Sequence, residues 1–110
     1  MAWVALFLAG VFEIVWAMVM KTSDGLRRPV PTVLTLAAMA VSVVLLAQAM
    51  RTLPVSTAYA VWTGIGAAGA AIFGVVIFGE SANALKLASV ALIVAGVIGL
   101  RLFGGAEAGR

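Results

Sequence analysis

The sequence predicts an all-α membrane protein of four transmembrane helices, assembled as an antiparallel, dual-topology homodimer. Of its 110 residues, 65% are hydrophobic and only 10% are charged, whereas a soluble domain carries about 25% charged residues. The apolar residues form four long stretches, each with about the 20 residues that a helix needs to cross the hydrocarbon core of a bilayer. These two observations exclude a water-soluble globular domain.

The chain is expected to form one four-helix transmembrane domain over residues 1–110. The predicted spans are 2–20, 30–50, 54–78 and 85–103. The first connection contains the turn dipeptide Asp24-Gly25, and Pro54 suits the first turn of the third helix. Connections this short force successive helices to run antiparallel, which predicts a small up-down-up-down bundle.

The first stretch is expected to be a retained helix rather than a signal peptide. It lacks a basic segment at its start, it is long enough to cross the membrane, and three further spans follow it.

The first span carries Glu13 close to the middle of the membrane, whereas all other charges lie in connections, in tails or near span ends. A charged side chain at that depth costs at least about 2.5 kcal/mol, so an ionisable residue there predicts a functional site. The alternative is a protonated Glu13 that hydrogen-bonds a neighbouring helix and only stabilises packing.

A lone carboxyl in an apolar environment binds either a proton or a cation, and it can therefore exchange one for the other. The chain offers no second acid near Glu13 for paired-carboxylate hydrolysis and no phosphate-binding glycine loop. Trp16 lies three residues further on and therefore on the same helix face, where its indole offers a ring face and an N–H donor. These residues predict a site for protons and a small organic cation.

The second and third spans contribute three further candidates for this site. Ser42 lies in mid-membrane, although bonding to the backbone of its own helix is an equally good interpretation. Tyr59 and Trp62 are three residues apart and share a face of the third span. Both could be interfacial aromatic residues, but the depth of Trp62 argues against that interpretation for Trp62.

Small residues in the last two spans predict helix contacts. Gly64, Gly66 and Gly69 of the third span permit close packing, a hinge, or both. In the fourth span Ser89 and Gly96 are seven residues apart and lie on one stripe, which is typical of a seam between helices. We interpret this stripe as the dimer interface, with coincidence as the alternative.

The distribution of Lys and Arg indicates almost no preferred orientation in the membrane. The side of the first and third connections carries Lys21, Arg27, Arg28 and Lys86, and the side of the termini carries Arg51, Arg101 and Arg110. Because the Lys and Arg excess of short cytoplasmic loops sets orientation, this near balance predicts that the chain inserts both ways round. Two copies of opposite orientation would then form a transporter with inverted symmetry. A weak bias, set by the adjacent arginines of the first connection, is the alternative.

The composition excludes several other functional classes. The chain has no His and no Cys, which removes the usual zinc ligands, cysteine nucleophiles and imidazole bases. We therefore expect no metal, no cofactor and no enzymatic activity. The net charge of +3 comes from cations scattered along the chain, and these form no basic stripe of the kind that binds nucleic acid.

Three segments resemble the small multidrug resistance (SMR) family of transporters, and the likeness extends over essentially the whole chain. They are Gly10-Val-Phe-Glu-Ile-Val-Trp-Ala17, residues 53–67 (LPVSTAYAVWTGIGA) and residues 79–83 (GESAN). Trp16, the run Trp-Thr-Gly-Ile-Gly at 62–66 and Glu80 favour the guanidinium-exporter subtype.

The resemblance implies an antiparallel dimer and a site in which Glu13 binds both proton and substrate. It also implies that Trp16, Ser42, Tyr59 and Trp62 line the site, with Trp16 and Ser42 bonded to the glutamate. We therefore expect a proton-coupled antiporter that exports guanidinium, and by extension small substituted guanidines, across the bacterial inner membrane. The alternatives are an SMR exporter of hydrophobic quaternary ammonium drugs, a non-transporting membrane assembly subunit and, less favoured, a channel.

Overall fold

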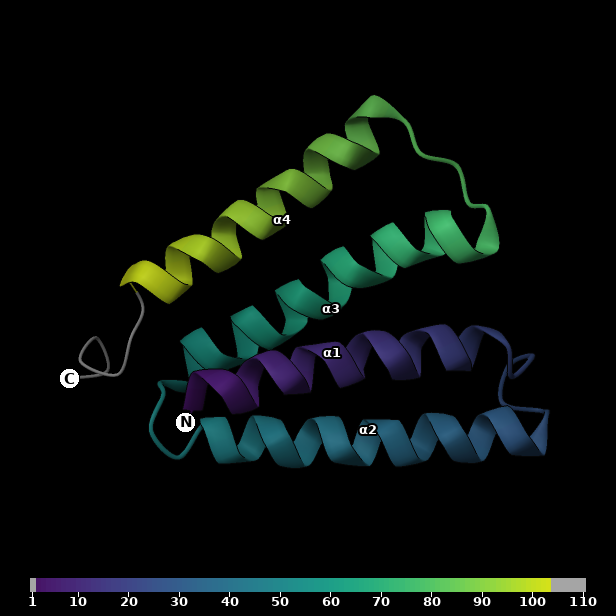
Figure 1. Ribbon diagram of the computed structural model, residues 1–110, viewed down its shortest axis with the longest axis horizontal. Coiled ribbons are helices and arrows are strands. Elements are labelled where there is room, and N and C mark those ends of the chain that lie inside the picture. Colours follow the sequence, from purple (N-terminus) through teal and green to yellow (C-terminus); the bar gives the residue numbers. More distant parts are fainter. Residues whose placement is uncertain (1, 104–110) are drawn as a thin grey trace.

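The computed structural model describes residues 2–103 and contains four α-helices (Figure 1). They are α1 (Ala2–Lys21), α2 (Pro29–Ala49), α3 (Val55–Phe78) and α4 (Ala84–Phe103). Each is long and apolar enough to cross a membrane. The four apolar helices confirm the predicted all-α class, and no helix end differs from the predicted span by more than one residue. Arg110, which enters the charge balance, lies outside the described residues.

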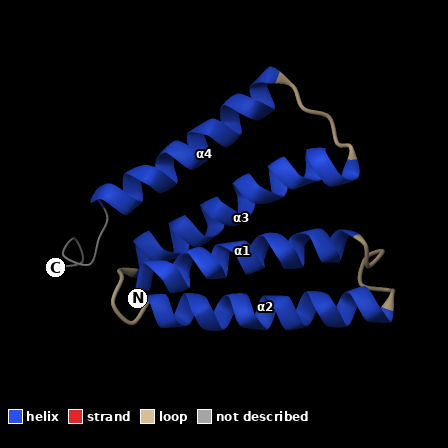
Figure 2. Cartoon of the chain, viewed as in Figure 1, coloured by secondary structure: helices blue, strands red, loops and turns tan. Residues whose placement is uncertain are grey.

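Successive helices run antiparallel, as the short connections require, but they form an open row rather than a closed bundle (Figures 1 and 2). Helix α1 lies between α2 and α3, and α4 packs on the outer side of α3. The molecule is accordingly flattened, measuring 45 × 34 × 17 Å. The predicted bundle shape therefore needs this correction. Lipid tails are as apolar as leucine side chains, so no hydrophobic force drives four such helices to close around a core.

The connections are built by local hydrogen bonds and two backbone reversals. In the first connection the backbone turns through positive φ at Asp24 and Gly25 (52° and 70°), which confirms the turn expected there. Helix α3 ends at Phe78 and is capped by Gly79, whose backbone is left-handed (φ 67°) and whose N–H bonds to the carbonyl of Gly74. Helix α4 begins after Asn83, whose side-chain Oδ1 accepts the backbone N–H of Lys86 at 2.8 Å.

The best-packed region joins α1, α2 and α3 in the half of the layer nearer the second connection (residues 50–54). Its buried apolar side chains are Leu6, Ala9, Leu46, Ala49, Leu53, Ala58 and Val61. Close approach of α1 and α3 continues beyond this cluster through glycines. A methyl group on Gly10 would overlap the side chain of Ile65, and one on Gly69 would overlap Ile14. These contacts fix the relative position of the two helices that carry most of the candidate site.

Candidate functional site

Glu13 points from α1 onto the backbone of α3. A β-carbon added to Gly66 would lie 2.7 Å from Cγ of Glu13 and would overlap the carboxyl group itself. The Glu13 side chain therefore fits here only because residue 66 is a glycine and has no side chain. Its Oε1 atom is buried and has no hydrogen-bond partner among the described residues.

The indole nitrogen of Trp16 is the second unpaired polar atom of the site. Within the described residues, Nε1 of Trp16 and Oε1 of Glu13 are the buried side-chain atoms that lack a hydrogen bond. Leaving such a group unpaired costs about 1–3 kcal/mol, and native structures rarely tolerate it. One atom is a hydrogen-bond donor and the other an acceptor, and they lie one helical turn apart on α1.

Ser42 links helices α1, α2 and α3 by hydrogen bonds one helical turn before Glu13. Its hydroxyl donates to the backbone carbonyl of Ala9 on α1 at 2.6 Å and accepts the indole N–H of Trp62 on α3 at 2.9 Å. The side chain is fully buried. The interpretation that Ser42 bonds to its own helix is therefore wrong.

The hydrogen bonds that the family resemblance implied at Glu13 are absent among the described residues of this chain. A serine hydroxyl has one proton to donate, and Ser42 donates it to the carbonyl of Ala9. Trp16 makes no hydrogen bond to the carboxyl either, since both atoms are unpaired. No signal in the sequence indicated the role of Ala9, because the group it contributes is a backbone carbonyl.

The two aromatic residues of α3 lie against each other, with ring centroids 5.5 Å apart and planes inclined by 54°. The N–H of Trp62 points inward to Ser42, so an interfacial role does not explain this residue. Tyr59 is 54% exposed and lies at the outer edge of the group. The structure thus brings Glu13, Ser42, Trp62 and Tyr59 to adjoining positions on three helices, with Trp16 one turn beyond Glu13.

The residues predicted for a dimer seam lie apart from this group. Ser89 is exposed, and its hydroxyl donates to the carbonyl of Leu85 in its own helix at 2.9 Å. No atom of the chain lies within 4 Å of where a β-carbon on Gly96 would be. Among its described residues α4 has none that is buried, so this stripe is open in the single chain.

The charges leave Glu13 without a counter-ion in the described part of the chain. The one ion pair found there joins Lys86 to Glu80, with Nζ 3.7 Å from Oε1. Residues 2–103 also contain no group of three or more carboxylates that could hold a metal ion. A carboxylate with a buried, unpaired oxygen is stabilised by taking up a proton or a cation, which makes Glu13 the candidate reactive group of the site.

Comparisons with known proteins give one consistent answer. A family model described as Small Multidrug Resistance protein matches residues 1–93. A protein named guanidinium exporter from Escherichia coli strain K12 is 60% identical over 102 residues, covering 93% of this chain and 97% of its own length. Guanidinium exporters from Citrobacter freundii and Salmonella typhimurium are each 57% identical over the same shares of both chains.

Proposed function

This chain belongs to the Small Multidrug Resistance family, and from that premise we propose that it exports guanidinium in exchange for protons. Membership confirms the resemblance found in the sequence. It makes the chain a multi-pass transporter of the bacterial inner membrane rather than an enzyme. The proposal is that Glu13 carries the proton and the cation in turn, and that residues 1–110 act as one transmembrane domain.

The observation that carries the proposal is the isolation of Glu13. Its carboxyl is half-buried in the middle of a membrane-spanning helix, with Oε1 unpaired and no cation within ion-pair distance among the described residues. In that setting the charged form needs a cation, and the neutral form needs a proton. Because both occupy the same oxygens, binding of one displaces the other, and this competition is the basis of antiport.

Guanidinium matches the hydrogen-bonding geometry of the Glu13 carboxylate itself. Its parallel N–H groups fit a carboxylate bidentately, and its charge persists at all physiological pH values. Guanidinium accepts no hydrogen bond, so the N–H of Trp16, which has no partner among the described residues, is not a donor to the substrate. The N–H of Trp62 is already held by Ser42, so Trp62 would contribute its aromatic ring rather than a hydrogen bond to a planar cation.

We further propose that the working unit is an antiparallel homodimer. The open row of helices leaves the Glu13 site without a second wall, and the near balance of cations on the two sides of the membrane permits both orientations. The stripe of Ser89 and Gly96 on α4 is open and lined by small residues, which suits a contact between two copies. Rocking of one copy against the other would then expose the site alternately to the two sides.

The test is transport by purified protein in liposomes with an imposed pH gradient. The native chain should accumulate guanidinium against its gradient, and Glu13→Gln should abolish accumulation because an amide cannot exchange protons. Asp24→Asn is the matched control, because it removes a carboxylate of the first connection, and it should transport normally. Undiminished, gradient-driven transport by Glu13→Gln would contradict the proposal.

Competition separates the alternatives that the sequence left open. A site that prefers tetraphenylphosphonium to guanidinium would indicate an exporter of hydrophobic cations. Silent behaviour of Glu13→Gln, with no proton release when guanidinium is added to the native protein, would indicate a non-transporting assembly subunit. Accessibility of a C-terminal tag from one side only would exclude the antiparallel homodimer.

A further inference from the structure

Helix α4 is attached very differently at its two ends. Near its C-terminus Val97 fills the space beside Gly64, where a β-carbon would lie 2.6 Å from Cγ2 of Val97. Leu100 packs against the apolar cluster of α1, α2 and α3. The guanidinium of Arg101 lies 4.7 Å from the centroid of the Trp3 ring, within the range of a cation–π contact. This end of α4 is therefore joined to both α1 and α3.

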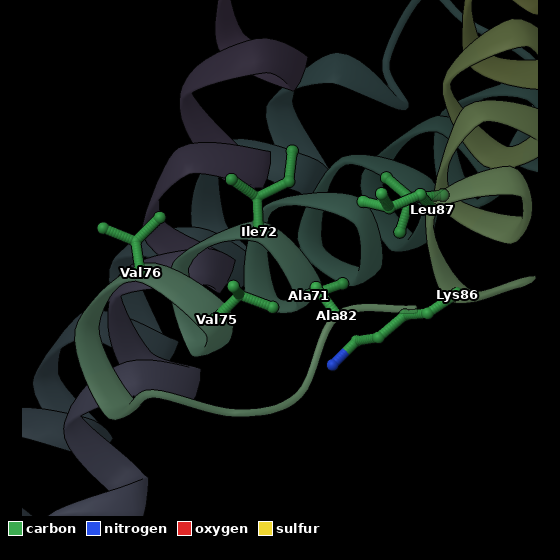
Figure 3. Close-up of a pocket in the computed structure, with 8 residues that line it drawn as sticks. Ala71, Ile72, Val75, Val76, Ala82, Lys86 and Leu87 are labelled. Carbon is green, nitrogen blue, oxygen red and sulfur yellow. The ribbon is translucent and has the colours of Figure 1, made fainter. Parts of the chain in front are cut away.

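At its N-terminal end α4 faces α3 across a cavity of about 130 Å³ (Figure 3). The walls are the apolar side chains of Ala71, Ile72, Val75 and Val76 on α3 and of Leu87 and Val90 on α4. At this end the two helices therefore line a cavity, and their side chains do not fill the space between them.

A pair of charged residues spans this loosely packed end. Beyond Gly79 the chain turns back, so that the Glu80 N–H bonds to the carbonyl of Gly74 at 3.3 Å and the Glu80 carboxyl rests on the bare backbone of Gly74. From the first turn of α4, Lys86 places Nζ 3.7 Å from Oε1 of Glu80 and donates to the carbonyl of Ser81 at 3.1 Å. In Figure 3 the Lys86 side chain extends from α4 toward the connecting loop beside the cavity.

The contact between Glu80 and Lys86 is weak because both side chains are partly exposed. The side chains of Lys86 and Glu80 are 32% and 46% exposed, and their charged atoms are in ion-pair contact without a hydrogen bond between them. Ion pairs of that exposure contribute little stability because water competes for both charges. The loop end of α4 is thus held by an exposed ion pair, whereas its other end is held by the contacts of Val97, Leu100 and Arg101 with α1 and α3.

We propose that the Glu80–Lys86 pair is a latch, which holds the loop end of α4 against α3 in this conformation and opens in every transport cycle. The inference rests on the proposed transport function and adds which helices move relative to each other. Helix α3 carries Tyr59, Trp62 and Gly66, and it pivots against α4 at the Gly64–Val97 contact when the latch releases. Transport then requires that the loop end of α4 can separate from α3. It does not require the Glu80–Lys86 ion pair itself, so a variant without the pair should still transport.

A reversible cross-link tests this requirement directly. The chain has no cysteine, so Glu80→Cys/Lys86→Cys offers a unique pair for a short bis-methanethiosulfonate linker. The matched control is Val30→Cys/Leu34→Cys, which joins exposed positions one turn apart within α2 near the same side of the membrane. Guanidinium transport in liposomes and guanidinium binding by calorimetry are measured before linking, after linking and after reduction.

The latch predicts that the linked Glu80→Cys/Lys86→Cys protein binds guanidinium but transports at least tenfold more slowly, with recovery on reduction, and that Glu80→Gln still transports. Undiminished transport by the linked protein would overturn the latch. So would equal loss in the linked control, or failure of the unlinked double variant or of Glu80→Gln to transport. Failure of the native chain to transport guanidinium at all would instead overturn the proposed function.

Discussion

Replacing Gly66 with alanine isolates the contact between Glu13 and α3. The added β-carbon would lie 2.7 Å from Cγ of Glu13 and would overlap the carboxyl group. Only the far end of a flexible side chain obstructs the new methyl group, so the helix can keep its position while the carboxyl moves. We therefore expect the protein to fold and the binding site to be damaged.

The size of the effect follows from what the displaced side chain must do. Overpacking by one carbon costs about 1–3 kcal/mol, and here the relief comes from moving Glu13 off its rotamer and out of line with the substrate. If that energy appears in binding, at about 1.4 kcal/mol per factor of ten, guanidinium affinity should fall by about 5- to 150-fold.

Calorimetric titration of guanidinium into the detergent-solubilised protein measures this loss. Gly64→Ala is the matched control, because the same substitution two residues earlier in the same helix meets Cγ2 of Val97 at 2.6 Å rather than Glu13. It should lower the temperature of unfolding but leave guanidinium affinity unchanged. Native affinity in Gly66→Ala, or an equal loss in Gly64→Ala, would refute the assigned contact.

Three further predictions concern the site and the assembly. Guanidinium affinity should fall as pH falls, by up to about tenfold per pH unit, because each cation that binds displaces one proton from Glu13; calorimetry over a pH series that shows constant affinity would contradict this. Ser42→Ala should lower the free energy of unfolding by about 1–3 kcal/mol, measured by denaturant titration, because the Trp62 N–H loses its acceptor. Gly96→Leu meets no atom of its own chain within 4 Å, so it should leave the protomer folded but shift dimer to monomer in light scattering.

The fold could be predicted closely because membrane-spanning helices are determined by local sequence. Twenty apolar residues must form a helix in lipid, since no other segment conformation pairs its own backbone groups there. Pro54 and Gly79 mark ends that the structure reproduces within one residue. The sequence could not predict which helices lie next to each other. That order depends on which side chains pack against which glycines of a neighbouring helix. The pairing of Gly10 with Ile65 leaves no periodic signal in either span.

The candidate site could be predicted in its residues but only partly in its bonds. Glu13 is conspicuous in the sequence because nothing else at that depth is charged, and Trp62 is conspicuous because it lies too deep for an interfacial role. The direction of a hydroxyl proton has no such signal. Ser42 could have bonded to its own helix or to Glu13, and the structure shows it bonded to the backbone of Ala9. That choice depends on the spacing between α1 and α2.

The proposed antiparallel dimer would account for both the open row of helices and the balance of cations. A single layer exposes the α3 side of the site, where Tyr59 is 54% exposed, so one chain cannot alternately shield and expose a carboxyl. A second layer in the opposite orientation would supply the missing wall. It would also relate the inward-facing and outward-facing states by symmetry and make them equal in free energy, so the gradients alone would set the direction of exchange. Such an assembly requires a sequence without a preferred orientation, and the numbers of cations on the two sides of the membrane are nearly equal. A protein with one fixed orientation would have no need of this balance.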